Sequence, residues 1–156
     1  LLVSMAADLP DQQELVTALI DNAEEIADLF GRYYPENTVN SLRDLLVRQV
    51  ELTGGLITQK KEGRTKDTVE QVRRLNENAD RIAELLASAT PEYEESVLKE
   101  MFRMHVDLTG QEISERLAGN YEKDLQTFGN IQRQIIAMAD YLASGLKTEA
   151  KESGLR

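Results

Sequence analysis

The sequence of 156 residues contains no cysteine and only one histidine, His105. The lack of cysteine excludes disulfides, thiolate nucleophiles, iron–sulfur clusters and sulfur-ligated zinc. A single histidine also excludes the paired Glu-x-x-His motifs that hold two metal ions in ferritin-like bundles. No apolar run approaches the roughly 20 residues that a membrane-spanning helix requires. We therefore expect no metal site of these kinds and no membrane-embedded segment.

Basic residues are also few, because 18 lysines and arginines stand against 28 acidic residues and give a net charge of −10. Such a chain repels phosphate backbones and anionic lipid surfaces. Neither nucleic acid nor a membrane is therefore an expected partner. Residues Leu1–Leu9 lack the basic start and the long apolar stretch of a signal peptide. We expect a cytoplasmic location, and because the chain starts at Leu1 rather than Met an upstream targeting sequence stays open.

Catalytic motifs are missing as well. The sequence has no glycine-rich phosphate loop after a strand, no Walker-type lysine and no nucleophile elbow. We therefore predict a non-catalytic binding or interaction module, with a small molecule or a protein as its unidentified partner. The alternative is a metal-dependent or histidine-assisted enzyme, supported only by His105 and nearby acidic residues. The sequence indicates no cofactor.

Apolar residues recur at intervals of three and four along every long segment, and alternating strand patterns are absent. This spacing predicts an all-α protein, with helices starting after Asp11, Pro35, Gly63, Thr90 and Gly119. Asp11 and Thr90 are expected to cap their helices. Connections of two to six residues force neighbouring helices to run antiparallel. We therefore expect one domain, residues 1–156, folded as an up-and-down bundle.

Two arrangements of this bundle fit the pattern. A four-helix core with an added hairpin is favoured over an open superhelical stack. In either case we expect the apolar stripes to be buried, including Leu19 and Ile26, Val69, and Leu125, Phe128 and Ile135.

A segment of the chain recurs at a constant spacing of 56 residues. Asn22–Leu29 is echoed by Asn78–Leu85 and, more faintly, by Gln134–Tyr141. This spacing predicts a repeated helical hairpin, with a partial unit at residues 1–41 and full units at 42–97 and 98–153. The first helix of the first unit is mostly missing, and the exposed apolar edge that it leaves predicts a homo-oligomer.

Polar residues interrupt the apolar stripes at repeat-related positions. His105 lies between Phe102 and Leu108, and Gln49 is its equivalent in the preceding unit. Threonine follows each of them by four residues. If the helices face one another, the polar side chains converge on a small ligand pocket; the candidate binding residues are Gln49, Thr53, Asn78, His105 and Thr109.

Two plainer interpretations stay open. A core histidine can be satisfied by a neighbouring helix, and a threonine hydroxyl can donate to the carbonyl four residues earlier. Gly54, Gly55 and Gly110 lie inside helices, where glycine costs about 1 kcal/mol relative to alanine. Close helix packing, a kink or room for a ligand would each account for them.

Several motifs are spread over nearly the whole chain, namely Leu9–Asp11, Tyr33–Pro35, Asn78–Leu86, Thr90–Pro91, His105–Thr109, Asn120–Asp124 and Met138–Asp140. With these motifs the chain resembles a family of small bacterial all-helical proteins of unassigned function. The resemblance implies an all-helical fold. Some members are called acetylglutamate kinase or glycosyltransferase, but those activities imply parallel α/β folds that this pattern excludes. Similar proteins tend to have histidine in place of Gln49, so this chain lacks part of any clustered-imidazole site.

Overall fold

The computed structural model describes the backbone of residues 1–152 and the side chains as far as Leu146. This part of the chain forms helices and no strands, which confirms the all-α class. The expected end of the third repeat unit, residue 153, lies outside it. The helices are α1 (Leu2–Ala6), α2 (Gln12–Phe30), α3 (Glu36–Lys61), α4 (Thr65–Ala89), α5 (Glu95–Leu117) and α6 (Tyr121–Glu152). Within residues 1–152, no helix combines the length and apolar character needed to cross a bilayer.

One expected helix cap and one helix start differ from the prediction. Asp11 precedes α2, but its side chain makes no capping hydrogen bond. Helix α5 begins at Glu95 rather than beside Thr90. The hydroxyl of Thr90 instead accepts a hydrogen bond from the amide of Glu92, at 3.4 Å, in the loop before the helix. Proline at position 91 therefore marks a loop here, since this residue is as compatible with a turn as with a first helical turn.

The C-terminal turns of α1, α3 and α5 have the same geometry. Gly63 and Gly119 follow α3 and α5 with positive φ angles of 68° and 75°, and Asp8 follows α1 with a φ of 53°. In each case the next amide donates to a carbonyl five residues earlier at 2.9 Å, as Leu9 does to Ser4. This pattern closes a helix in a Schellman motif. Helix α1 thus has the shape of the last turn of α3 or α5.

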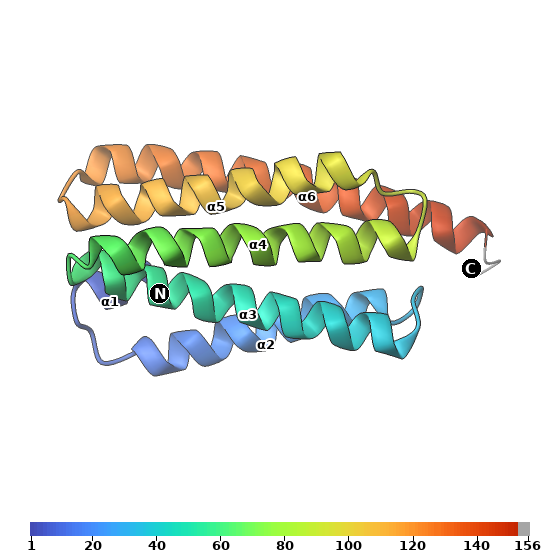
Figure 1. Cartoon of the computed structure of the whole chain (residues 1–156), viewed down its shortest axis with the longest axis horizontal. Helices are drawn as coiled ribbons and strands as arrows, with labels where there is room; N and C mark the ends of the chain where they lie inside the picture. Colours follow the sequence, from blue (N-terminus) through green and yellow to red (C-terminus); the bar gives the residue numbers. More distant parts are fainter. Residues whose placement is uncertain (153–156) are drawn as a thin grey trace.

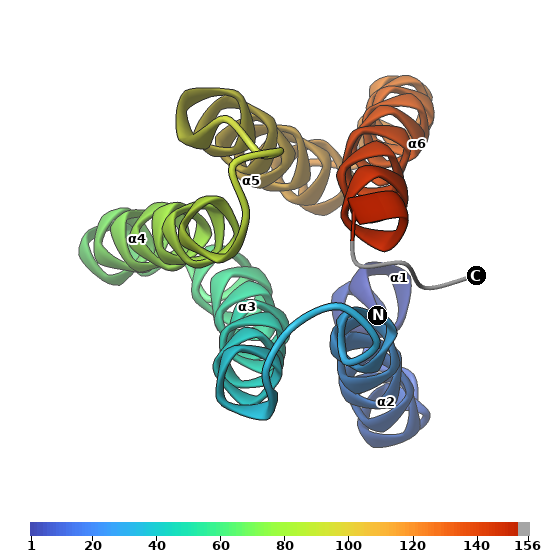
Figure 2. The same ribbon diagram turned by 90° about the vertical axis from the view of Figure 1, so that its right-hand side faces the viewer.

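The five long helices run antiparallel and lie side by side in chain order (Figure 1). Seen along their axes they form an arc from α2 through α3, α4 and α5 to α6 (Figure 2). Helix α1 lies between the two ends of this arc and contacts α3 and α5. In the described part of the chain α2 and α6 do not pack along each other. The arrangement is therefore an incomplete ring, and the expected four-helix core with an added hairpin is wrong.

The core has two apolar clusters along the inside of this arc. One lies near the α2–α3 and α4–α5 connections and contains Leu86, Tyr93 and Leu98. The other lies toward α1 and contains Leu56 and Ile113, with residues of α1 packed against it. The side chains predicted to be buried follow this inside surface except along α2, α6 and the start of α4. Those exposed against expectation are Leu19, Ile26, Val69, Leu125, Phe128 and Ile135.

Candidate functional site

Helices α3 and α4 are joined by a buried amide. Nδ2 of Asn78 donates to the carbonyl of Leu45 at 2.9 Å and to Oε1 of Gln49 at 2.8 Å. Both hydrogens of the amide are therefore used between the two helices. Since Asn78 is almost fully buried, these bonds remove the cost of placing its amide inside the protein.

Helices α5 and α6 are joined in the same way. Nε2 of Gln134 donates to the carbonyl of Met101 at 2.9 Å, which turns Oε1 of Gln134 toward Nδ1 of His105 at 3.0 Å. Because Oε1 can only accept, Nδ1 carries the proton of the neutral imidazole. Burial lowers the pKa of His105 below its usual 6.5, and the hydrogen bond to Gln134 opposes this shift.

These contacts recur at a spacing of 56 residues. Asn78 and Gln134 lie 56 residues apart, and so do Gln49 and His105. Residues at this spacing are called equivalent below. Asn78 and His105 therefore lie in two separate helix pairs, and each forms a hydrogen bond to a side chain of the neighbouring helix. Gln134 completes the second pair, and its amide bridges two helices, one of the two roles that its place in the repeated segment suggests.

Local contacts explain Thr53 and Gly55. The Thr53 hydroxyl donates to the carbonyl of Gln49 at 2.8 Å, as the plainer interpretation expected. A Cβ atom on Gly55 would come within 2.5 Å of the Gln71 amide, so close packing accounts for this glycine. Open space surrounds the Cβ positions of Gly54 and Gly110. Thr109, the equivalent of Thr53, is partly buried.

A groove with a volume of about 320 Å³ lies between α2 and α6 and is almost entirely apolar. None of the five predicted ligand residues lines it. Ile26, Leu29 and Phe30 form the α2 wall, and Leu42, Leu46, Ile82, Leu86 and Phe102 of the central helices form the floor. The α6 wall consists of Ile135, Met138, Ala139, Leu142, Ala143 and Leu146.

The α2 wall belongs to an apolar stripe that extends beyond the groove to Leu19, and the equivalent stripe of α4 is buried. Leu19 is 39% exposed, whereas Leu75, its equivalent in α4, is 2% exposed because it packs in the core. Ile26 is 40% exposed, whereas its equivalent Ile82 is 1% exposed. The α2 stripe therefore has the sequence of a helix-packing face, but no helix within residues 1–152 covers Leu19 and Ile26.

The α6 wall shows the same contrast. Ile135 is 43% exposed, whereas its equivalents Ala79 in α4 and Ala23 in α2 are buried. Ala139 is also exposed, although its equivalents Ala27 and Ala83 are fully buried. Both walls of the groove are thus faces that pack against a neighbouring helix elsewhere in the protein.

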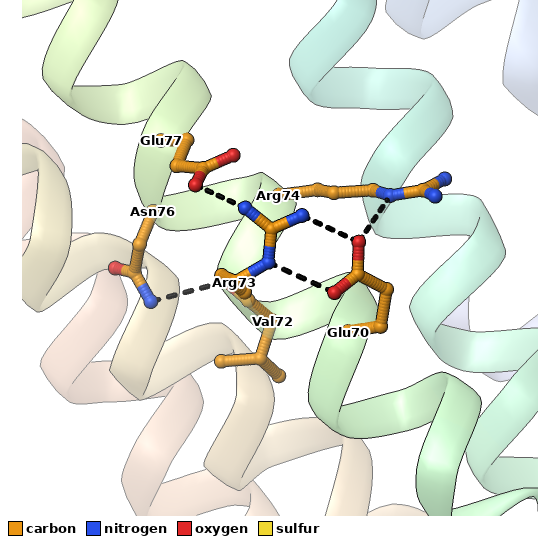
Figure 3. Close-up of polar contacts among 6 residues, drawn as sticks. All are labelled: Glu70, Val72, Arg73, Arg74, Asn76 and Glu77. Atoms are coloured by element: carbon orange, nitrogen blue, oxygen red, sulfur yellow. Dashed lines mark hydrogen bonds and ion pairs between the residues drawn. The ribbon is translucent and has the colours of Figure 1, made fainter.

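Charged groups cluster away from the groove. On the surface of α4, Glu70 accepts hydrogen bonds from Arg73 at 2.5 and 2.8 Å and from Arg74 at 3.0 Å (Figure 3). These arginines, Arg73 first, lower the pKa of Glu70 to about 2. Arg73 also contacts Glu77. Because the cluster is exposed and its charges are paired within one helix, it is a helix-stabilising network.

A buried ion pair joins α5 to the start of α6. Asp124 is 1% exposed and pairs with Arg116, whose guanidinium lies 5.2 Å from the centre of the Tyr121 ring. Burial, and then the charge of Asp124, raise the pKa of the nearby Glu112. No group of three histidine, aspartate or glutamate side chains in the described chain is arranged to hold a metal ion.

Comparisons with known proteins add no relative. No protein-family model, curated protein or solved structure matches this chain.

Proposed function

We propose that this protein is a non-catalytic interaction module that binds one amphipathic α-helix of a protein partner in the α2–α6 groove. The observation that carries the proposal is the exposure of two groove residues, Ile26 and Ile135, whose equivalents Ile82 and Ala79 in α4 are buried. Hydrophobic grooves between helices commonly receive the apolar face of an amphipathic helix. Covering these side chains would remove apolar surface from water, which favours binding.

A helical partner fits this site better than a small polar ligand does. The groove walls and floor are apolar, so they offer almost no hydrogen-bonding groups with which to orient a polar molecule. The polar pocket expected around Gln49, Thr53, Asn78, His105 and Thr109 stays a prediction. The hydrogen bonds of Asn78 and His105 to neighbouring helices argue against this pocket, because they leave fewer hydrogen-bonding groups for a ligand.

A helix of this chain supplies the probe for the test. The peptide comprises residues 94–111, because α5 already packs between two helices of the same kind, α4 and α6. Isolated helices of this length are marginal in water. Glu100 and Met104 are exposed in α5, so a lactam between Glu100 and lysine in a Met104→Lys peptide holds the helix without changing its packing faces. An added N-terminal tryptophan reports binding by fluorescence, since the protein has none.

We expect saturable one-to-one binding, weakened at least about tenfold by Ile135→Glu, because a carboxylate on the groove wall loses hydration when the helix covers it. Val69→Glu is the matched control, since Val69 is 68% exposed on α4 and does not line the groove. Circular dichroism would show that both variants keep the fold. No saturation, or equal affinity for the parent and Ile135→Glu, would contradict helix binding.

Sedimentation at the titration concentration separates a partner helix from a second copy of this chain. We expect a monomer that binds the peptide. A dimer that Ile135→Glu dissociates would show that the groove is covered by another copy, as the expected homo-oligomer requires, and would overturn the proposal of a partner helix.

A further inference from the structure

Helix α1 occupies one end of a sixth position in the ring. In Figure 2, α2, α4 and α6 alternate around the axis with α3, α5 and α1. Helices α1, α3 and α5 also contact one another. Helix α1 is only five residues long, so it fills this position for about one turn, and the apolar groove occupies the same gap between α2 and α6.

The direction of α1 sets the direction of the vacant position. Helices α1, α3 and α5 end in the same kind of turn, at Asp8, Gly63 and Gly119, and these turns lie at the same end of the molecule (Figure 1). A helix in line with α1 would therefore run parallel to α3 and α5 and antiparallel to α2. Its last residue would meet Leu1.

A polar contact fixes the register in both complete helix pairs. In each pair, an amide on the second helix contacts a carbonyl and a Gln or His side chain four residues later on the first helix. Leu45 and Gln49 play these parts for Asn78, and Met101 and His105 for Gln134. Asn22 is the equivalent amide on α2, but it is exposed because α1, with five residues, is too short to lie opposite it.

We infer that the groove accepts its helix in a single direction and register, parallel to α3 and α5, with Asn22 recognising a glutamine or histidine on that helix. This inference rests on the proposed function and names its partner more closely: an amphipathic helix with two apolar stripes and one Gln or His between them. Asn22 is then a specificity-determining residue. If leucine replaces the Gln or His, the bound helix covers the Asn22 amide without offering it a hydrogen-bond partner, and this lowers the affinity.

A double-mutant cycle tests the recognition by Asn22. The parent protein and Asn22→Ala are each titrated with the lactam peptide carrying His105, with its His105→Gln variant and with its His105→Leu variant. We expect Asn22→Ala to weaken binding about tenfold for the first two peptides and less than about twofold for the third. Asn37→Ala is the control, because Asn37 is an exposed asparagine at the start of α3. Equal losses for all three peptides would overturn the recognition.

Nitroxide labels test the direction. A label on a cysteine added to the C-terminus of the peptide should broaden the amide signals of Leu2–Ala6, and a label at the N-terminus should broaden those near Phe30. The unlabelled protein has no cysteine, so the labels stay on the peptide. Reversed broadening would overturn the direction while leaving helix binding intact. A peptide that does not bind at all would instead refute the proposed function, so the two failures are distinguishable.

Discussion

Asn78 donates a hydrogen bond of 2.8 Å to the side-chain oxygen of Gln49, and this contact holds α3 and α4 in register. Asn22 has the equivalent position on α2, yet it is exposed to solvent. The two asparagines differ only in whether a helix stands opposite them. This contrast links the interior of the complete helix pairs to the open groove, and it leads to the first prediction.

Replacing Asn78 should destabilise the fold, whereas replacing Asn22 should not. Asn78→Ala removes the side-chain hydrogen bond to the carbonyl of Leu45 and leaves Oε1 of Gln49 without this donor, at an expected cost of about 1–3 kcal/mol. Asn22→Ala changes an exposed side chain and should stay within about 0.5 kcal/mol. Urea denaturation of both variants measures the difference. Similar losses of stability in both variants would show that this asparagine stabilises its own helix rather than the contact between two helices.

Acidification should destabilise the protein through His105. Because burial lowers the folded-state pKa of His105 below 6.5, the unfolded chain takes up its proton first as the pH falls. The stabilisation is therefore fully present above about pH 6.5 and decreases from there toward the folded-state pKa. His105→Gln should remove this part of the pH dependence, and glutamine is already present at the equivalent position 49.

Urea denaturation at pH 7.5 and pH 5.5 measures this effect. Glu112 acts in the opposite sense, because burial raises its pKa and its protonation favours the folded state. The comparison of the parent with His105→Gln isolates the histidine, since both chains contain Glu112. The same pH dependence in both would rule out a perturbed His105.

Removing Arg116 should cost more than removing a surface arginine. Arg116→Met leaves the Asp124 carboxylate buried without its cation, at an expected loss of about 3–5 kcal/mol. Arg73→Met is the control, because Arg73 belongs to an exposed network and should cost less than about 1 kcal/mol. Adding Asp124→Asn to Arg116→Met should recover part of the loss. Chemical denaturation of the three variants measures these differences, and equal losses for Arg116→Met and Arg73→Met would argue against a buried pair.

Two glycines in helices should respond to alanine with opposite signs. The Cβ position of Gly110 is open, so Gly110→Ala should stabilise the protein by up to about 1 kcal/mol. A Cβ on Gly145 would overlap the ring of Tyr93, whose hydroxyl donates to the carbonyl of Leu142 at 2.6 Å. Gly145→Ala should therefore destabilise by about 1–3 kcal/mol. Thermal denaturation of both variants measures these changes in stability. A destabilising Gly110→Ala would mean that the helix needs glycine at this position for another reason.

The helical fold could be predicted from the sequence because the apolar spacing and the short connections are local features. The ring arrangement could not, since it depends on which faces of antiparallel helices pack together. The threonine–proline pair at Thr90 also misled the prediction of a helix start. Proline favours both a first helical turn and a loop, and only the tertiary contacts distinguish them.

Part of the site could also be predicted. The sequence identifies His105 and Gln49 as polar residues on apolar stripes, and Asn78 hydrogen-bonds to Gln49 in the structure, but ligand binding by these residues stays a prediction. The groove was harder to predict, because Ile26 and Ile135 have the spacing of buried residues. Periodicity shows which face of a helix is apolar, but it does not show whether another helix covers that face. That the 56-residue spacing reflects a repeated hairpin stays a prediction.

The central claim is that the α2–α6 groove is a vacant helix position. The most direct test of this claim is to add a helix ahead of Leu1. Residues 94–112 are joined directly to Leu1, which places His105 at the 56-residue spacing before Gln49 while the added helix continues into α1. The join makes binding intramolecular. The account predicts that the free energy of unfolding rises by about 2 kcal/mol or more as the groove is covered. The same fusion carrying Ile135→Glu should lose most of this gain. No rise, or an equal rise in both chains, would contradict the account.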